Sequence, residues 1–391
     1  MASSPMADKD YLAKPDYVPE STRAQVSGTS GKTILVAEHA GFCYGVRMAV
    51  DKAFELAHAS RCCNSDNSCS SDAQQPATMA NTSDKPVYVL GELIHNPQVV
   101  SRLRDMGVKT VACVDDIPAG STCLIRTHGV DPGHIDTAQA RDIDVTDATC
   151  PDVRRVQDSA KQLAEEGYVV VIVGKANHPE VIGIKAHCER IEGARIVTVT
   201  SVDEFDEAFA GVSKNRIGVV SQTTQLEEAF KQIVAHAAQQ CRELKVFNTI
   251  CPATFKRQSA AEALAKQVDI VVVVGGKNSS NTGHLAEVCR NNNTPALHVE
   301  TAEELAQYKD VLEAHQVIGV TAGASTPDWL IQAVIEYLEA LGSETGVSAA
   351  EKLDSGRRSV NNAQTLAHPV YPVDPVDPVH SAHSVIGASV S

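Results

Sequence analysis

Three cysteines occur at nearly equal intervals along the chain, each where a strand-like segment ends and a helix-like segment begins. They are Cys43, Cys150 and Cys251, separated by 107 and 101 residues. Cys251 lies in the segment Asn-Thr-Ile-Cys-Pro, Cys150 in Asp-Ala-Thr-Cys-Pro, and Cys43 in Ala-Gly-Phe-Cys-Tyr-Gly. This regular spacing predicts three copies of one structural unit, each presenting one thiolate.

Other segments repeat in step with the cysteines. Gly174 and Gly275 each end an apolar run 24 residues beyond the cysteine of their unit, whereas Gly91 lies 48 residues beyond Cys43. An inserted polar stretch, residues 60–84, accounts for the difference. A second strand and loop follow each of these glycines, 48 residues later in the second and third units and 37 residues later in the first.

The apolar runs lack the alternation of a half-exposed strand, which indicates parallel strands covered on both faces. Helical patterns separate them, so we expect an α/β fold with small parallel sheets, in which ligands bind beyond the carboxyl ends of the strands. Three unrelated α/β units would explain the strands but not the single cysteine in each. Expected strands begin near residues 33, 86, 123, 169, 217, 270 and 317, and expected helices cover 46–59, 153–166, 227–240, 255–267, 283–291 and 327–341.

Composition shifts set the predicted boundaries of the domains. Residues 60–84 are rich in Ser, Asn, Asp and Cys, and such a stretch cannot bury enough apolar surface to become ordered. We expect a disordered extension at 1–32, a first lobe at 43–150 with a flexible insertion at 60–84, a second lobe at 151–250, a third lobe at 251–342 joined by an N-terminal strand at 33–42, and a disordered tail at 343–391.

Charge and cysteine content narrow the possible functions. The net charge of −15 argues against nucleic-acid binding, which needs a basic surface, and no apolar run approaches the roughly 20 residues that span a bilayer. The first 32 residues lack an apolar signal core and contain several acidic side chains, so we expect a cytoplasmic protein. In that setting the 11 cysteines favour metal or catalytic use over disulfides.

The remaining eight cysteines fall into two groups. Five lie in apolar or helical patterns and are expected to be small core residues, and three lie in the 60–84 insertion, where a flexible segment is favoured over a metal-binding tract. The first group is Cys113, Cys123, Cys188, Cys241 and Cys289, and the second is Cys62, Cys63 and Cys69.

Three thiolates brought together from three units could hold an inorganic centre. Zinc takes four tetrahedral ligands, and its sites usually contain a close Cys-x-x-Cys pair or a nearby histidine. An iron–sulfur cubane takes cysteine thiolates and is wide enough for ligands from three separate units. The spacing favours the cluster, while zinc and a metal-free trio remain open.

Polar side chains close several of the expected strand-end loops. Imidazoles, hydroxyls, amides and glycine-backed N–H groups would suit a phosphate or diphosphate, although a lone histidine is usually structural. No P-loop or dinucleotide fingerprint is present, which disfavours a nucleotide cofactor. The residues are His95, His128, His178, Ser279, Ser280, Asn281 and Ser325.

Two further residues could handle protons. A carboxyl at Glu180, away from bulk water, would have its pKa raised and could deliver a proton. The alternative is an acidic residue placed in a first helical turn because of the helix dipole. Thr223 and Thr224 could orient a substrate hydroxyl, or they could cap the helix that follows.

Nine motifs in this order resemble the 4-hydroxy-3-methylbut-2-enyl diphosphate reductase (LytB) family, from about residue 33 to 342. They are Gly-Phe-Cys-Tyr-Gly-Val, Ile-His-Asn-Pro-Gln-Val-Val, Thr-His-Gly-Val, Asp-Ala-Thr-Cys-Pro, Asn-His-Pro-Glu-Val, Ser-Gln-Thr-Thr, Asn-Thr-Ile-Cys, Lys-Asn-Ser-Ser-Asn-Thr and Thr-Ala-Gly-Ala-Ser-Thr-Pro. The resemblance implies three pseudo-threefold-related α/β domains in a trefoil around one central 4Fe-4S cluster. It assigns Cys43, Cys150 and Cys251 as the cluster ligands, with the fourth iron open to substrate.

The resemblance also implies an enzyme of the non-mevalonate isoprenoid pathway. The enzyme is an iron–sulfur oxidoreductase acting on CH or CH2 groups, and it removes the hydroxyl of its substrate to give isopentenyl and dimethylallyl diphosphate. Diphosphate binding falls to His95, His128, His178, Ser279, Ser280, Asn281 and Ser325, proton delivery to Glu180, and contact with the substrate hydroxyl to Thr223. An iron–sulfur protein is the implied electron partner, with ferredoxin or flavodoxin as the donor, and a monomer or homodimer is expected. Ile182 replaces a residue that is often acidic in relatives.

Two other functions compete with this one. A non-catalytic iron–sulfur or phosphate-binding module would need neither Glu180 nor Thr223, so their presence favours the enzyme. A zinc hydrolase acting on a diphosphate would hold a colourless metal in place of a brown cluster.

Overall fold

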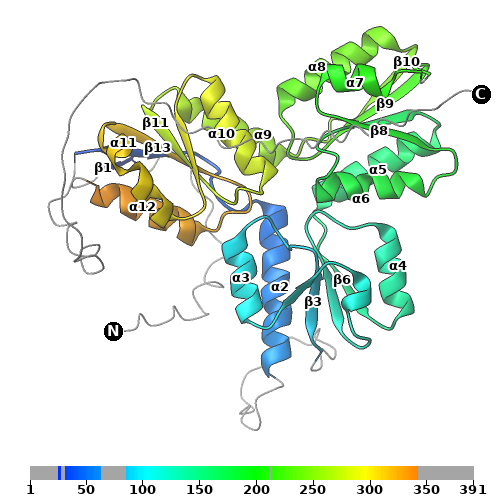
Figure 1. Cartoon of the computed structure of the whole chain (residues 1–391), viewed down its shortest axis with the longest axis horizontal. Helices are drawn as coiled ribbons and strands as arrows, with labels where there is room; N and C mark the ends of the chain where they lie inside the picture. Colours follow the sequence, from blue (N-terminus) through cyan, green and yellow to red (C-terminus); the bar gives the residue numbers. More distant parts are fainter. Residues whose placement is uncertain (1–24, 28–30, 63–84, 212, 342–391) are drawn as a thin grey trace, which may run out of the picture. The chain divides into compact units, whose positions relative to one another are not determined.

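The computed structural model describes residues 25–27, 31–62, 85–211 and 213–341, all within the compact unit Met1–Gly346. These residues form three small sheets with helices on both faces (Figure 1). All strand pairs are parallel except one at the edge of the third sheet, so the predicted α/β class with small parallel sheets is confirmed.

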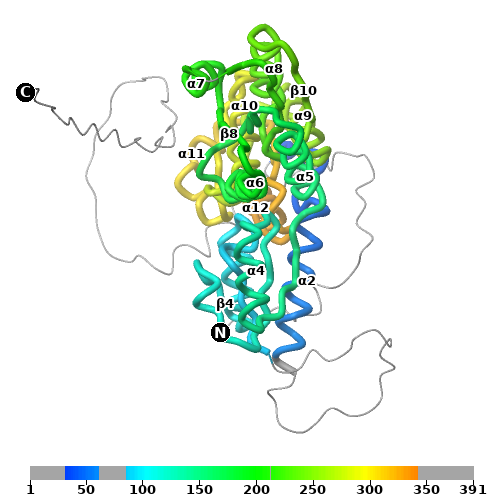
Figure 2. Tube along the Cα trace, turned by 90° about the vertical axis from the view of Figure 1, so that its right-hand side faces the viewer, coloured from blue at the N-terminus to red at the C-terminus, as the bar shows by residue number. Residues whose placement is uncertain are grey.

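The first sheet has the strand order β4-β3-β5-β6. Its strands are β3 (Val87–Leu90), β4 (Lys109–Val111), β5 (Thr122–Ile125) and β6 (Asp144–Asp147). Its helices are α2 (Tyr44–Cys62), α3 (Pro97–Asp105), the 3-10 helix η1 (Val114–Asp116) and α4 (Pro132–Ala140). Figures 1 and 2 both show α2 running alongside this sheet, and α2 packs against α3 and β3.

The second sheet repeats this arrangement in the order β10-β9-β7-β8. Its strands are β7 (Val169–Val173), β8 (Arg195–Val199), β9 (Arg216–Ser221) and β10 (Glu243–Val246). Its helices are α5 (Pro151–Glu165), α6 (Pro179–Glu189), α7 (Val202–Ala208) and α8 (Glu227–Gln240).

The third sheet has the order β1-β2-β13-β11-β12 and combines both ends of the described chain. Its strands are β1 (Gln25–Ser27), β2 (Thr33–Val36), β11 (Ile270–Val274), β12 (Ala296–Val299) and β13 (Val317–Ala322). Its helices are α9 (Pro252–Ala265), α10 (Ser280–Asn291), η2 (Ala302–Tyr308), α11 (Lys309–Glu313) and α12 (Asp328–Ala340). Residues 25–27, expected within a disordered extension, instead form β1, which pairs antiparallel with β2.

The three sheets match strand for strand, which explains the sequence repeat. β3, β7 and β11 are the first central strands, β5, β9 and β13 the second, and β6, β10 and β2 lie beside the second. The chain leaves each strand of this last set through one cysteine and enters a helix: β2 leads to Cys43 and α2, β6 to Cys150 and α5, and β10 to Cys251 and α9. Because α2 packs on the first sheet while β2 belongs to the third, Cys43 stands where the chain passes from one lobe to another.

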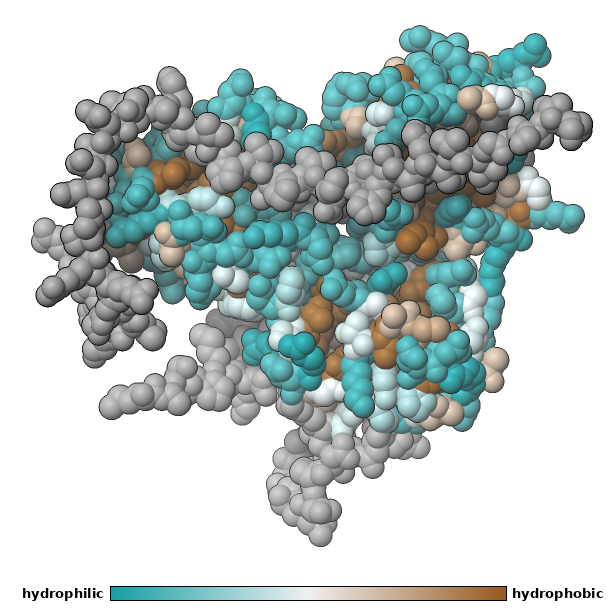
Figure 3. All heavy atoms as spheres, in the orientation of Figure 1, coloured by the Kyte–Doolittle hydropathy of each residue, from teal (hydrophilic) through white to brown (hydrophobic). Residues whose placement is uncertain are grey.

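Each sheet separates two apolar layers, as expected for strands covered on both faces. In the second sheet Val169, Val171 and Val173 face one layer, while Val170 and Ile172 face the other. On the face shown in Figure 3 most described residues are hydrophilic, with smaller apolar areas between them. No helix in the described ranges is both long and apolar enough to cross a membrane.

Glycines in two equivalent strands let the cysteine-bearing helices approach closely. A Cβ on Gly218 of β9 would lie 2.7 Å from Cδ2 of Leu163 on α5. A Cβ on Gly319 of β13 would lie 3.0 Å from Cδ2 of Leu264 on α9. The two glycines are 101 residues apart, and so are the two leucines. The same interval separates Cys150 and Cys251. The repeat therefore extends into the core packing.

The expected core cysteines divide into two sets. Cys123, Cys188 and Cys289 are buried, as predicted, whereas Cys113 and Cys241 are only partly buried. Helix α2 continues to Cys62, beyond its expected end at residue 59, and the rest of the predicted insertion, with Cys63 and Cys69, lies outside the described residues.

Candidate active site

One pocket gathers every site residue that the sequence singled out. It is lined by Cys43, His95, His128, Cys150, His178, Glu180, Thr223, Cys251, Ser279, Ser280, Asn281 and Ser325. The sheet topology accounts for this convergence, because these residues follow the carboxyl ends of corresponding strands in the three sheets. Ile182 is 49% exposed on α6 and does not line the pocket.

The three cysteines share one local structure at the beginning of a helix. Cys150 and Cys251 are the N-cap residues of α5 and α9, and Cys43 immediately precedes α2. Backbone N–H groups of the first helical turn point at the sulfurs: Val46 N lies 3.5 Å from Sγ of Cys43, and Thr254 N lies 3.3 Å from Sγ of Cys251. The positive ends of three helix dipoles therefore face the thiols, an arrangement that favours negative charge there.

The thiols fit a wide inorganic centre better than a single ion. A tetrahedral zinc holds its sulfur ligands about 3.8 Å apart, given a Zn–S distance of roughly 2.3 Å. Within the described ranges the three thiols are not a group whose ligand atoms all lie within 4.8 Å, so at least one pair is too far apart for one zinc ion. A cubane takes its ligands from more widely spaced positions. The cysteines thus fit a cluster, and Gly45 leaves room for them, since a Cβ there would lie 2.3 Å from Sγ of Cys150.

Burial makes two of these thiols, Cys150 and Cys251, hard to ionise in the absence of a cation. It raises the pKa of Cys150 to about 11 and also raises the pKa of Cys251, and in both cases backbone N–H groups oppose the effect. A metal centre that binds thiolates at neutral pH must therefore displace protons.

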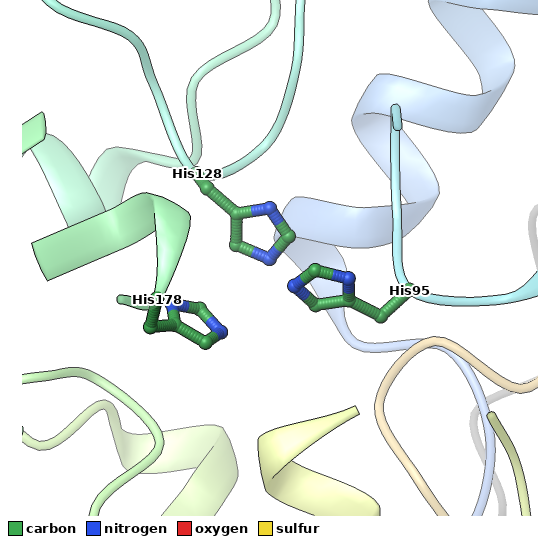
Figure 4. A group of neighbouring side chains, drawn as sticks. All are labelled: His95, His128 and His178. Atoms are coloured by element: carbon green, nitrogen blue, oxygen red, sulfur yellow. The ribbon is translucent and has the colours of Figure 1, made fainter. Parts of the chain in front are cut away.

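The same pocket is lined by three histidines whose rings lie against one another (Figure 4). The ring centroids of His95 and His128 are 4.3 Å apart, and that of His178 lies 5.2 Å from His95 and 5.3 Å from His128. Burial is the main cause that lowers the pKa of all three, to about 3 for His178 and well below the ordinary value for His128. The rings are therefore neutral near pH 7, and each can donate one hydrogen bond.

Several polar atoms beside these rings are buried without a partner among the described residues. They are Nε2 of His95, Nδ1 of His128, Oγ of Ser280, and Oδ1 and Nδ2 of Asn281, whereas Nδ1 of His95 lies 3.7 Å from Oε2 of Glu92. Ser280 and Asn281 form the first turn of α10, so their backbone N–H groups face the pocket at a helix N-terminus. Buried polar groups without partners are costly, and an anionic ligand with several acceptor oxygens would satisfy the donors among them.

The three histidines could also bind a metal ion. Among the described His, Cys, Asp and Glu side chains, they are the one group of three whose ligand atoms all lie within 4.8 Å of one another. Three neutral imidazoles could bind a zinc ion with an open fourth position. The adjacent N-terminus of α10 favours a phosphate-like anion over a bare cation, because its backbone N–H groups and the positive end of the helix dipole repel a metal ion.

Glu180 and Thr223 form a buried pair that lines the same pocket as the cysteines and the histidines. The backbone N–H of Thr223 donates to Oε1 of Glu180 at 2.6 Å, and its hydroxyl donates to Oε2 at 2.8 Å. Glu180 is 1% exposed, and burial raises its pKa to about 7, although both hydrogen bonds from Thr223 act in the opposite direction. A carboxyl with this pKa can hold a proton near neutral pH and release it.

One buried residue near the cysteines was missed in the sequence. Arg257 is 5% exposed on α9 and lines a second cavity that also reaches Cys43. The sequence contains a pattern that could have indicated this residue: an arginine follows each of the three cysteines by four to six residues.

Comparison with known proteins identifies the family. A family model described as LytB protein matches residues 71–339, more than half of the chain. The chain belongs to the LytB family. The matched region includes all predicted site residues except Cys43, which lies before it.

Relatives named 4-hydroxy-3-methylbut-2-enyl diphosphate reductase match most of this chain. The relative from Geobacter sulfurreducens is 41% identical over 307 residues, covering 78% of this chain and 96% of the relative. The relative from Caldanaerobacter subterraneus subsp. tengcongensis is 38% identical over 319 residues, covering 80% and 98%.

Two solved structures share the fold. A structure of (E)-4-hydroxy-3-methyl-but-2-enyl diphosphate reductase, the terminal enzyme of the non-mevalonate pathway, is 39% identical with a TM-score of 0.55, covering 78% of this chain and 98% of that chain. The corresponding reductase from Plasmodium falciparum is 26% identical with a TM-score of 0.67, covering 78% and 87%.

Proposed function

We propose that this protein reduces (E)-4-hydroxy-3-methylbut-2-enyl diphosphate to isopentenyl and dimethylallyl diphosphate, the last step of the non-mevalonate pathway. The reaction takes up two electrons and two protons and releases one water. Three features of one pocket support the proposal. They are three thiols at helix N-termini, a buried carboxyl with a pKa of about 7, and buried hydrogen-bond donors that have no partner among the described residues.

The proposed cofactor is one 4Fe-4S cluster held by Cys43, Cys150 and Cys251. When bound, this cluster would supply electrons and a Lewis-acidic iron with one open coordination position. The convergence of the three thiols in one pocket and the N–H groups that point at the sulfurs support this assignment.

The diphosphate end of the substrate would occupy the side of the pocket with the histidines. Neutral His95, His128 and His178 can each donate one hydrogen bond to phosphate oxygens. The hydroxyls of Ser279, Ser280 and Ser325, the Asn281 amide and the N-terminus of α10 would add further donors. Anchoring at this end orients the reacting carbon toward the cysteines and supplies binding energy remote from the bond that breaks.

Proton delivery would fall to Glu180 through Thr223. The carboxyl holds a proton near neutral pH, and the hydroxyl of Thr223, 2.8 Å from Oε2, extends its reach toward the departing oxygen. Hydroxide is a poor leaving group, so protonation as the C–O bond breaks lowers the barrier.

The electron donor is proposed to be a ferredoxin or flavodoxin. The enzyme would then be an oxidoreductase that acts on CH or CH2 groups and receives its electrons from this partner protein. Cys43 also lines a second cavity, together with the exposed cations Arg47 and Lys256. These cations are available to an acidic donor. The eight cysteines whose side chains the structure describes are free thiols, which supports a reducing, cytoplasmic setting.

A second candidate rests on the histidine group. Zinc bound by His95, His128 and His178 would create a metal hydroxide beside the diphosphate pocket, and a hydrolase would result.

Anaerobic turnover separates the candidates. Protein purified without oxygen is mixed with reduced methyl viologen and the substrate, and the products are identified by NMR. We expect a brown protein that oxidises two viologens for each five-carbon product. Release of inorganic phosphate without viologen oxidation would favour the hydrolase, and a brown protein without turnover would leave only a binding module.

A further inference from the structure

Arg257 is a buried cation placed between two of the cysteine-bearing segments. Its side chain extends from α9 and is 5% exposed. Nη2 donates to the carbonyl of Gly41 at 2.6 Å, and Nη1 donates to the carbonyl of Ala253 at 3.1 Å. Gly41 precedes Cys43 by two residues and Ala253 follows Cys251 by two, so one guanidinium holds both segments in place.

The charge of this guanidinium has no acidic partner within the described part of the chain. Asp152 and Asp328 line the same cavity, but neither forms an ion pair with Arg257 there. Nε is also buried, and no described residue forms a hydrogen bond with it. A buried cation normally has a carboxylate beside it, because desolvation costs several kcal/mol that pairing offsets.

Nearby arginines contrast with this one. Arg154 is exposed and pairs with Asp147 at 2.6 Å, and Arg155 is exposed and pairs with Asp152 at 3.2 Å. Burial lowers the pKa of Arg257, and Cys43 and Cys251 would oppose this lowering once they are ionised as ligands of a metal centre. Among the described residues, Arg257 is therefore a buried cation beside the cysteines without a carboxylate paired to it.

We propose that Arg257 is the counter-charge of the iron–sulfur site and holds the cluster at a higher reduction potential than the cysteines alone would give. Thiolate-ligated clusters are anionic, and an added electron increases their negative charge. A fixed cation in a buried site favours the more negative, reduced state. Arg257 is a positioning residue in this account, and the inference rests on the proposed cluster.

The test compares Arg257→Gln and Arg257→Lys with the wild type, each loaded with cluster under anaerobic conditions. The midpoint potential is measured by a redox titration followed by EPR, and iron is measured per chain. We expect a lower potential in Arg257→Gln and a potential close to that of the wild type in Arg257→Lys, since lysine keeps the charge. Lys256→Gln is the matched control, because Lys256 is an exposed cation on the neighbouring position of α9. Its removal should change the potential less than the loss of Arg257.

The outcomes are distinct. Equal potentials in Arg257→Gln and Lys256→Gln, with full iron content, would overturn the inference and leave Arg257 a structural clamp. If Arg257→Gln folds by circular dichroism but loses iron, retention of iron in Arg257→Lys supports the counter-charge and loss of iron in both variants refutes it. A wild type without a cluster would refute the proposed function itself, whereas an active wild type with unchanged variants would refute only the role of Arg257.

Discussion

The buried carboxyl of Glu180 should make the stability of the protein depend on pH in a defined direction. Burial raises its pKa from the ordinary value of 4.5 to about 7. Between these values the folded state holds a proton that the unfolded chain has lost, so the unfolding free energy falls as the pH rises through this window. A rise of this size corresponds to about 3 kcal/mol, and the part lost between pH 5 and pH 8 is about 2 to 3 kcal/mol.

Urea unfolding of cluster-free wild type and Glu180→Gln at pH 5 and pH 8 would measure this contribution. The amide does not titrate, so the stability of the wild type relative to the variant should fall by about 2 to 3 kcal/mol between the two pH values. Glu189→Gln removes an exposed carboxylate from the same helix and should not reproduce the change. A difference between wild type and Glu180→Gln that stays constant with pH would refute the raised pKa and the proton-delivery role built on it.

The remaining predictions concern turnover, binding and packing. If the protonated form of Glu180 is the active one, kcat should fall as the pH rises above about 7, and Glu180→Gln should lower kcat by roughly 10²–10⁴-fold and remove this pH dependence; an unchanged alkaline limb in the variant would assign it to another group. Asn281→Ala removes donors at the diphosphate end, so KM should rise more than kcat falls, and steady-state kinetics with the reverse pattern would place Asn281 at the reacting carbon instead. Gly218→Ala forces a methyl group against the fully buried Leu163 and should lower the unfolding free energy by about 1 to 3 kcal/mol, measured in urea, whereas an unaltered midpoint would show that α5 can shift freely.

The central strands were predictable because they are buried on both faces. Ile270–Val274 is entirely buried and consists of apolar residues, so the sequence alone indicates a strand there. The neighbouring β8 and β12 were not predicted. Their residues alternate or are mostly half-exposed, as in Arg195–Val199, and edge strands of this kind carry little apolar signal.

The site residues were predictable because the repeat places them at equivalent strand ends. His95, His178 and Ser279 follow β3, β7 and β11, and parallel strands bring their carboxyl ends to one edge of each sheet. The family resemblance then assigned individual roles, which remain proposals. Placement in one pocket is what the structure adds.

Some features of the site depend on tertiary packing and could not be obtained from the sequence. The contact of the three imidazole rings requires loops from two different sheets, and no spacing along the chain encodes it. The isolation of Arg257 is likewise visible only once its neighbours are known, because an arginine on a helix is usually exposed. β1 was missed because three residues of an otherwise polar segment give no periodic signal.

The most direct test is to measure the iron and sulfide content of the wild type after anaerobic purification and to record its Mössbauer spectrum. The same measurements are made on Cys43→Ser, Cys150→Ser and Cys251→Ser. The account predicts about four irons and four sulfides per chain in the wild type, one iron with a spectrum distinct from the other three, and loss of the cluster in each variant. Zinc in place of iron, or a full cluster that survives any of the three substitutions, would contradict it.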